Sequence, residues 1–197
     1  MKYLKGDRVV RVQESPSRPN TPPISMCQWI AQYIRQHQST LPFAGLLTPA
    51  ATLVPAPKSS LMKPGSLWVP QRLAAALVNA GLGKVVLSCL ERATPVEKAA
   101  LSPPEKRPTA QKHFETLRVV PGLEATSEIV AVDDVVTTGA MLLGSASLLS
   151  RAFPNSRIRG FAAMRAMTDP GRFEDIIAPC AGTITFLPAT GRTIRSP

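Results

Sequence analysis

The sequence predicts an α/β fold in which a mainly parallel β-sheet is flanked by helices. Short apolar segments alternate along the chain with segments of helical periodicity, the pattern of strands joined by crossover helices. Residues 128–132 form a near-continuous apolar run without polar alternation, which is typical of a strand buried on both faces. The chain has 197 residues, 44% of them hydrophobic, which suffices for one domain with a sizeable core.

We predict a single domain over residues 1–197. Residues 1–45 supply an N-terminal arm and helix, residues 50–165 the core, and residues 166–197 a C-terminal hood or edge. Four apolar segments are the expected strands of the sheet, and the third is expected to be central: 51–54, 84–87, 129–132 and 157–163. Two further strands are expected at 8–12 and, as the last in the chain, at 182–187.

Three segments have the apolar spacing of amphipathic helices, and they cover residues 26–38, 67–80 and 141–153. Ser25 and Ser66 are the expected N-caps of the first two, because a serine side chain can accept a hydrogen bond from a free backbone N–H. Gly81 is expected to end the second helix. Trp29 and Tyr33 share the apolar face of the first helix, so they are expected to be core contacts.

Residues 91–118 contain ten charged residues and four prolines, with few large apolar groups. Such a segment is too long and too polar for an ordinary connection. We expect it to lack regular structure without a ligand. It is then either a lid that closes over a ligand or a charged linker, and the residues alone leave both alternatives open.

The chain carries a formal net charge of +10, from 23 Lys and Arg against 13 Asp and Glu. No acidic residue occurs between Ser15 and Leu90. A strongly basic chain favours a polyanionic partner: a nucleic acid, a membrane surface or a phosphorylated small molecule. No apolar run approaches the ~20 residues that span a bilayer, so no transmembrane helix is expected. Of the three kinds of polyanionic partner, we do not expect the membrane.

The N-terminus is charged and lacks the apolar core of a signal peptide, so we expect a cytoplasmic protein. Three cysteines, Cys27, Cys89 and Cys180, lie far apart and form no CxxC pair. Neither a zinc ribbon nor a disulfide framework is therefore predicted, and the three are expected to be buried free thiols.

The chemistry-bearing segment follows the central strand. Asp133 and Asp134 come directly after it, and a turn with the sequence Thr-Thr-Gly leads into the next helix. Backbone N–H groups at a helix N-terminus bind phosphate, and Gly139 lets the backbone approach a ligand closely. Carboxylates accept hydrogen bonds from sugar hydroxyls and attract Mg²⁺. The segment therefore predicts a site for a sugar phosphate.

Residues 129–141 resemble the phosphoribosyl diphosphate (PRPP) motif of type I phosphoribosyltransferases. The resemblance implies a type I phosphoribosyltransferase-like fold with a small hood built from the terminal segments. It also implies that Asp133 and Asp134 contact the ribose hydroxyls and Mg²⁺, the latter through those hydroxyls or water. By the same resemblance, the 5′-phosphate lies on the turn formed by Thr137, Thr138, Gly139, Ala140 and Met141.

The longer layout, over about residues 50–165, resembles ComF-type, competence-associated members of that family. Residues 53–57 resemble their Pro-x-Pro strand end, and residues 91–114 follow their flexible loop in spacing. The chain departs from them in lacking the N-terminal zinc-finger cysteines. It also has Glu97 and Thr109 in place of the usual loop Gln and Asn. Met141 replaces the hydroxyl residue that closes the phosphate turn, which removes a donor worth about 1 kcal/mol.

The resemblance implies Mg²⁺-dependent transfer of phosphoribose from PRPP to a nitrogenous acceptor, with release of pyrophosphate. Lys58 and Arg107 are the implied catalytic cations on pyrophosphate, and Ser59 an additional binding residue. A solvated loop lysine is the alternative for Lys58. If residues 91–118 form a lid, its cations clamp the leaving group: Arg92, Lys98, Lys106 and Arg107. His113 receives no role.

A second hypothesis is a non-catalytic PRPP sensor or nucleic-acid-binding protein on the same fold, linked to DNA uptake or competence. The net charge and six arginines from Arg157 onward favour it. The low aromatic content, 5%, gives few platforms for base stacking and disfavours it. The family also implies a homodimer, and the acceptor cannot be read from the sequence.

Overall fold

The computed structural model describes residues 2–10, 23–97, 107–120, 127–166 and 178–196. Several expectations lie outside these residues: most of the N-terminal arm, part of the C-terminal segment, and the lid cations Lys98 and Lys106. Among the described residues, no helix is long and apolar enough to cross a membrane.

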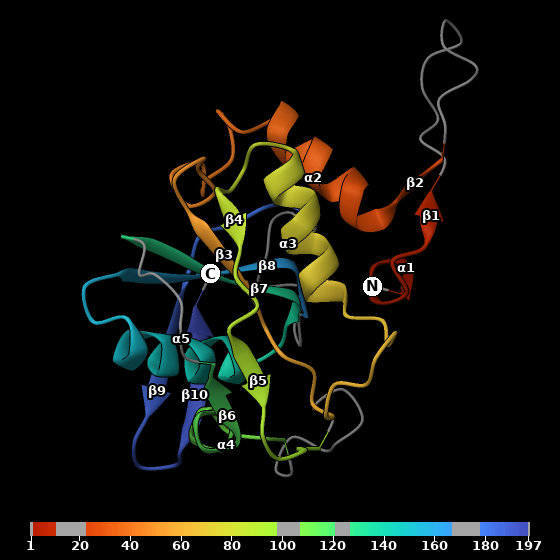
Figure 1. Ribbon diagram of the computed structural model, residues 1–197. Helices are drawn as coiled ribbons and strands as arrows, with labels where there is room; N and C mark the ends of the chain where they lie inside the picture. The colour runs from red at the N-terminus through yellow and green to blue at the C-terminus, as the bar shows by residue number, and fades with distance from the viewer. Residues whose placement is uncertain (1, 11–22, 98–106, 121–126, 167–177, 197) are drawn as a thin grey trace, which may run out of the picture.

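The core is a parallel sheet of four strands in the order β4-β3-β7-β8 (Figure 1). The strands are β3 (Thr52–Pro55), β4 (Val85–Val86), β7 (Glu128–Val136) and β8 (Arg157–Arg165). β7 pairs with β3 on one side and β8 on the other, and residues 129–132 are buried. The predicted α/β fold and its central strand are therefore confirmed.

Helices cover both faces of this sheet. Alternate residues of β7 point to opposite sides, so each face of the strand packs against a different helical layer. Val130 and Val132 pack with α2 (Met26–Gln36) and α3 (Val69–Asn79). Ile129 and Ala131 pack instead with α5 (Ala140–Ala152). Figure 1 shows α2 and α3 on one side of the sheet and α5 on the other. Both faces of the strand are apolar because both are covered.

The helix ends follow local sequence signals, with one exception. Ser25 caps α2: its Oγ accepts from the Gln28 N–H at 3.3 Å, and the Gln28 side chain accepts from the Ser25 N–H at 2.9 Å. The predicted cap at Ser66 is wrong, because α3 begins later and its N-cap is Trp68. Proline in the first turn of α3 sets this start. Gly81 has φ +75° and follows the C-cap, as predicted.

The N-terminal segment is fastened to the helical layer by Asp7. This segment comprises α1 (Lys2–Lys5) and β1 (Val9–Val10), which pairs with β2 (Ile24–Ser25). Asp7 Oδ1 accepts from the Cys27 N–H at 3.0 Å, and Oδ2 from Arg72 Nη1 at 3.1 Å. Burial raises the pKa of this carboxyl, but hydrogen bonds from Cys27 and Arg72 outweigh it, so the pKa is lowered. The ionised carboxylate thus joins three segments.

The expectation that residues 91–118 lack regular structure is wrong at both ends of that segment. β5 (Leu90–Arg92) pairs with β6 (Leu117–Val119), and α4 (Ala110–Thr116) directly precedes β6. Leu90 and Leu117 are buried, so the charged segment has an apolar base. Gly144 lets α4 approach α5, since a Cβ there would lie 2.7 Å from the His113 Cβ.

The C-terminal segment forms an antiparallel hairpin of β9 (Thr183–Leu187) and β10 (Arg192–Ser196). The strand predicted at 182–187 is therefore present but is not the last. The hairpin lies beside α5 in Figure 1, away from the α2–α3 side of the sheet. Ile184 joins the apolar cluster on the α5 face, which holds the hairpin there.

Two expectations about burial are wrong. Trp29 and Tyr33 are 37% and 40% exposed, because they flank the buried stripe of α2 rather than belong to it. Their rings stack at 5.6 Å. Cys27 and Cys89 are buried as expected, whereas Cys180 is exposed.

Candidate active site

The acidic pair lies where β7 extends beyond the end of its neighbour β3. Pairing with β3 ends at Pro55 and Val132, but β7 continues along β8 to Val136. Asp133 and Asp134 therefore lie on a strand that has lost one neighbour, at the carboxyl end of the sheet. Asp133 Oδ1 accepts from the Asp134 N–H at 2.8 Å. Sites of α/β sheets form at these strand ends because the sheet opens there.

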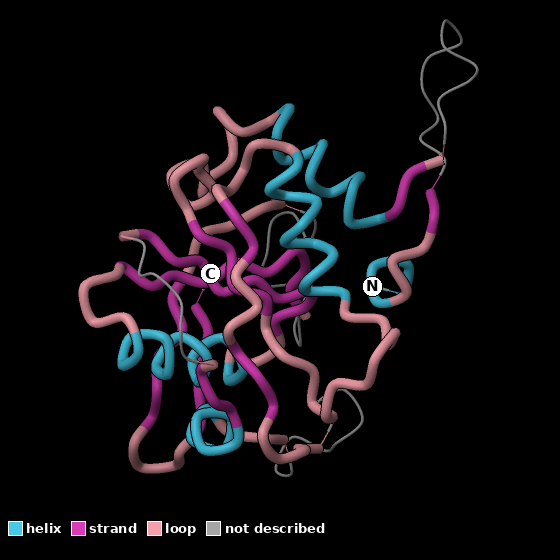
Figure 2. Tube along the Cα trace, in the orientation of Figure 1, coloured by secondary structure: helices cyan, strands magenta, loops and turns pink. Residues whose placement is uncertain are grey.

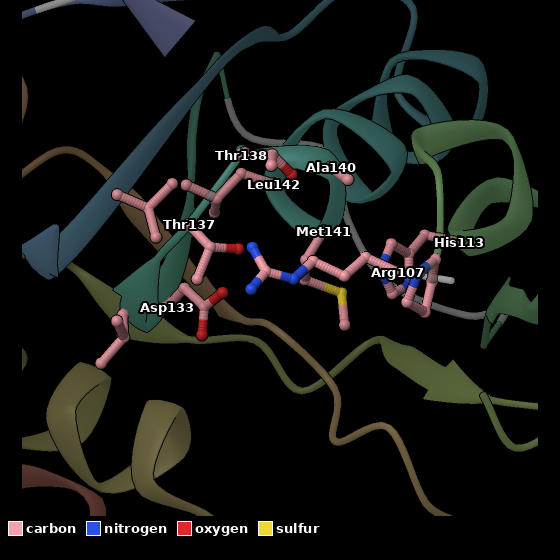
Figure 3. Close-up of a pocket in the computed structure, with 12 residues that line it drawn as sticks. Arg107, His113, Asp133, Thr137, Thr138, Ala140, Met141 and Leu142 are labelled. Atoms are coloured by element: carbon pink, nitrogen blue, oxygen red, sulfur yellow. The ribbon is translucent and has the colours of Figure 1, made fainter. Parts of the chain in front are cut away.

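A pocket opens beside this end of β7 and continues over the first turn of α5 (Figure 3). Its lining includes one carboxylate, one arginine, one histidine, two hydroxyls and the start of α5. The lining residues are Arg107, Pro108, His113, Asp133, Val135, Val136, Thr137, Thr138, Gly139, Ala140, Met141 and Leu142. The structure thus brings together Asp133, Arg107 and the whole turn that the sequence singled out.

The predicted turn leads directly into the first turn of α5. Gly139 is the N-cap, with φ +85°, a conformation that L side chains rarely adopt. Its carbonyl accepts from the Leu143 N–H at 2.9 Å. Among the residues that the structure describes, no side chain caps this helix, so its first-turn N–H groups have no side-chain acceptor of the usual kind there. The helix dipole adds to these donors in favouring an anion.

The C-terminal hairpin holds the turn from outside. Thr193 Oγ1 donates to the Thr138 carbonyl at 2.9 Å, and Arg195 Nη1 donates to the Val136 carbonyl at 3.0 Å. Ile184 packs on Gly139. These contacts join segments more than forty residues apart in the chain, and no local sequence pattern indicates them.

Asp133 has an unusual electrostatic environment. Burial raises its pKa above the ordinary range, and the adjacent charge of Asp134 raises it further. Part of its surface still reaches the pocket, where the Arg107 side chain extends toward Asp133 and Thr137 (Figure 3). A ligand that offers hydroxyl donors or a cation at this point would stabilise the ionised carboxylate.

Three predicted site residues do not line this pocket: Asp134, Lys58 and Ser59. Asp134 neighbours Asp133, and its Oδ1 accepts from the Val135 N–H at 3.0 Å. Lys58 and Ser59 lie, half-buried, in the long loop between β3 and α3, drawn pink in Figure 2. The Ser59 carbonyl accepts from the Val96 N–H at 2.9 Å, which ties this loop to the residues after β5.

Two residues near the pocket have different positions from those expected. Arg92, expected among the lid cations, is only 5% exposed and lies at the end of β5. His113, which received no role, is equally buried on α4 and lines the pocket. The helical spacing of Ala110, His113 and Leu117 is a signal that could have placed the histidine on a buried face.

The described part of the pocket offers few protein ligands for a metal ion. Among the described residues, no group of three or more His, Cys, Asp or Glu side chains could hold a metal ion. Two adjacent carboxylates do fit Mg²⁺ that arrives with a polyphosphate, because that ion keeps several waters and needs few protein ligands. The repulsion that raises the pKa of Asp133 is also what a cation would relieve.

The fold and site together define an α/β protein whose pocket lies at the carboxyl end of a parallel sheet. No protein-family model and no curated protein matches the sequence. Among solved structures, the chain is similar to adenine phosphoribosyltransferase from Leishmania tarentolae, with a TM-score of 0.29 and 15% identity over 82% of this chain and 85% of that chain. Nothing in these comparisons points to ComF-type members in particular.

Proposed function

We propose that the protein is a phosphoribosyltransferase that binds PRPP and transfers its phosphoribose to a nitrogenous acceptor. The observation that supports this most directly is one pocket lined by Asp133, Arg107 and the turn at Thr137–Thr138–Gly139. Backbone donors at a helix N-terminus suit a terminal phosphate, and a carboxylate beside them suits sugar hydroxyls. Few ligands other than a sugar phosphate offer both groups.

In the proposed reaction, an acceptor nitrogen forms a bond to ribose C1 while the bond from C1 to the pyrophosphate oxygen breaks. The nitrogen loses its proton to solvent, and the bonding electrons leave with pyrophosphate. Positive charge develops on the ribose, which the carboxylates of Asp133 and Asp134 stabilise. Arg107 extends into the same pocket from the segment before α4, and its proposed role is to neutralise the leaving group.

Mg²⁺ bound to the pyrophosphate group of the substrate would supply positive charge that stabilises the leaving group. Asp133 and Asp134 would hold it through water or ribose hydroxyls. Lys58 and Ser59 remain proposed contacts for pyrophosphate from the β3–α3 loop. The chain's own residues bind and orient the substrate, and exclusion of water protects PRPP from hydrolysis.

The test is isothermal titration with PRPP in the presence of Mg²⁺, followed by a screen of purine, pyrimidine and other nitrogenous acceptors for pyrophosphate release. The proposal predicts saturable PRPP binding that requires the acidic pair, and release of pyrophosphate with at least one acceptor. Absence of PRPP binding to the folded protein would overturn it. Binding without turnover across the screen would favour the sensor hypothesis.

The second candidate, nucleic-acid binding, is favoured by one surface. The rings of Trp29, Tyr33 and His37 stack in series along α2, with centroids 5.6 and 4.3 Å apart. They lie in a part of the sequence that has basic but no acidic residues. Exposed aromatic rings stack on the bases of single strands, and cations attract the backbone.

Fluorescence anisotropy with a single-stranded oligonucleotide at several salt concentrations tests this candidate. Trp29→Ala with Tyr33→Ala should weaken binding, and wild-type affinity should fall as salt rises. Tyr3→Ala is the matched control, because Tyr3 is also exposed (54%) but lies on α1 outside the stack. Equal loss in the control, or no binding by the wild type, would remove this candidate.

A further inference from the structure

Arg92 is a buried cation that the proposed reaction does not use. It lies at the end of β5 and is 5% exposed. Its Nε donates to the Lys58 carbonyl at 3.0 Å and its Nη1 to Thr116 Oγ1 at 2.7 Å. Its Nη2 contacts His113 Nδ1 at 3.3 Å and Met141 Sδ at 3.7 Å. All these acceptors are neutral.

Within the described ranges, no carboxylate forms an ion pair with Arg92. Burial alone lowers the pKa of its guanidinium, to about 10, so the group is still charged at neutral pH. A buried charge without a counter-ion is costly, and neutral acceptors offset only part of that cost. A negative charge supplied from outside the chain would complete the site.

The neighbours of Arg92 direct its charge toward the pocket. His113 and Met141 both line the pocket, and Met141 belongs to the first turn of α5. Arginine only donates, so His113 Nδ1 must accept, and the proton of the neutral ring lies on Nε2. The pKa of His113 is lowered to about 4 by burial and by the charge of Arg92, which keeps the ring neutral.

Arg92 also joins two loops that the proposed substrate would contact. Its hydrogen bond to the Lys58 carbonyl fixes the loop after β3, and its contact with Met141 fixes its position relative to the anion-binding turn. The same guanidinium contacts α4 through His113 and Thr116. One side chain therefore spans the β3–α3 loop, α4 and α5.

We propose that Arg92 is a positioning residue whose buried positive charge is the counter-charge of a phosphate or diphosphate group bound at the first turn of α5. It acts through the Lys58 loop, the fixed Nε2–H tautomer of His113 and the position of Met141, without touching the ligand. This inference deepens the proposed phosphoribosyltransferase site and rests on it for the place where the anion binds. The source of the anion can be inorganic or a sugar phosphate, since the recognised chemistry is shared.

The test compares Arg92→Lys and Arg92→Met with the wild-type protein, using inorganic pyrophosphate and inorganic phosphate as probes in isothermal titration. Arg92→Lys keeps the charge and should bind pyrophosphate within about threefold of wild type. Arg92→Met keeps much of the length but not the charge, and should bind about tenfold more weakly or worse. If the guanidinium only fills space, Arg92→Met should bind pyrophosphate as well as Arg92→Lys does.

Arg118→Met is the matched control for overall charge. Arg118 lies opposite Glu91 in the same β5–β6 pair, with 67% of its side chain exposed. The Arg118→Met variant should bind pyrophosphate as tightly as the wild type does. Equal affinities for Arg92→Met and wild type would overturn the inference, as would an equal loss in Arg118→Met.

A spectroscopic measurement covers the case in which Arg92→Met does not fold. The chain has only two histidines, His37 and His113, so their ring ¹⁵N signals are readily assigned. The wild-type His113 ring should show the neutral Nε2–H tautomer, and its signals should shift on addition of pyrophosphate. The other tautomer, or no shift on saturation, would contradict the inference.

The two proposals fail in different ways. If PRPP binds but the loss in Arg92→Met is absent, the inference fails and the proposed function stands. If PRPP does not bind while inorganic pyrophosphate binds in an Arg92-dependent manner, the proposed function fails and the anion site stands. Failure of wild-type protein to bind any of the three anions would overturn both.

Discussion

Ile184 of the C-terminal hairpin packs directly on Gly139 of the proposed phosphate turn, so that a Cβ at position 139 would lie 2.7 Å from Ile184 Cδ1. The same glycine has φ +85°. Two independent constraints, backbone conformation and space, therefore select glycine at this position. The contact also couples the hairpin to the turn, although the two are distant in the sequence.

Gly139→Ala should lower the free energy of unfolding by about 2–4 kcal/mol, from backbone strain of about 1 kcal/mol together with a steric clash. Urea denaturation measures this change. Gly81→Ala is the control, because Gly81 has φ +75° but open space around it, and only the strain is expected there. Adding Ile184→Ala to Gly139→Ala should remove the clash, so the two substitutions should not be additive. Additive losses would contradict the packing explanation.

Replacing Asp133 and Asp134 with asparagine should abolish PRPP binding while leaving the fold as stable as in the wild type. Neutral amides bind ribose hydroxyls and Mg²⁺ more weakly than carboxylates do. The substitution also removes repulsion between the two adjacent carboxylates, and asparagine Oδ1 can still accept from the next backbone N–H. Titration calorimetry and thermal unfolding measure the two effects. Unchanged affinity for PRPP in the folded double variant would refute the assignment.

Arg107→Ala should lower turnover about tenfold or more while changing PRPP affinity less. The reason is that negative charge on the leaving group is greatest in the transition state, where a cation contributes most. Steady-state kinetics and titration calorimetry separate the two. Lys112→Ala, which removes an exposed cation from nearby α4, should change neither. Equal losses of affinity and turnover would indicate ground-state binding only.

The burial of His113 beside Arg92 predicts a loss of folding stability in acid. Burial and the charge of Arg92 lower its folded-state pKa to about 4 from an ordinary 6.5. Between these values the unfolded chain binds the proton and the folded protein does not, so stability falls as pH falls through this window. The full effect is about 3 kcal/mol, complete below pH ~4 and absent above pH ~6.5.

His113→Asn tests this pH dependence, because asparagine keeps an acceptor near Arg92 but does not titrate. Urea denaturation at intervals from pH 4 to pH 7 should give a shallower slope for His113→Asn than for the wild type. Parallel curves would show that His113 contributes nothing to the acid sensitivity.

Thr52→Val should leave stability unchanged or raise it by about 1 kcal/mol. The Thr52 hydroxyl is buried in β3 and has no hydrogen-bond partner in the described part of the chain, and valine has nearly the same shape. Thr116→Val is the contrasting variant, because Thr116 Oγ1 accepts from Arg92 and donates to the Lys112 carbonyl. It should lose about 1–3 kcal/mol. Denaturant unfolding compares the two, and equal effects would show that the difference in hydrogen bonding has no weight.

The sequence by itself determined the features that depend on neighbouring residues. The apolar run at 129–132 predicted a strand buried on both faces, and Ser25 predicted the start of α2. The acidic pair and the Thr-Thr-Gly turn were identified because they are contiguous. Hydrophobic period, capping and strand-to-helix turns act within a few residues, so each leaves a complete local pattern.

Only the tertiary structure decided features that join distant segments. It buried Arg92 against His113, and it packed Ile184 on Gly139. It left Trp29 and Tyr33 exposed although their spacing suits a core, because the layer formed with α3 covers only the neighbouring stripe of α2. The local sequence pattern indicates on which side of its helix or strand a residue lies. Its burial depends on which segment folds over it, and that is set by packing across the whole chain.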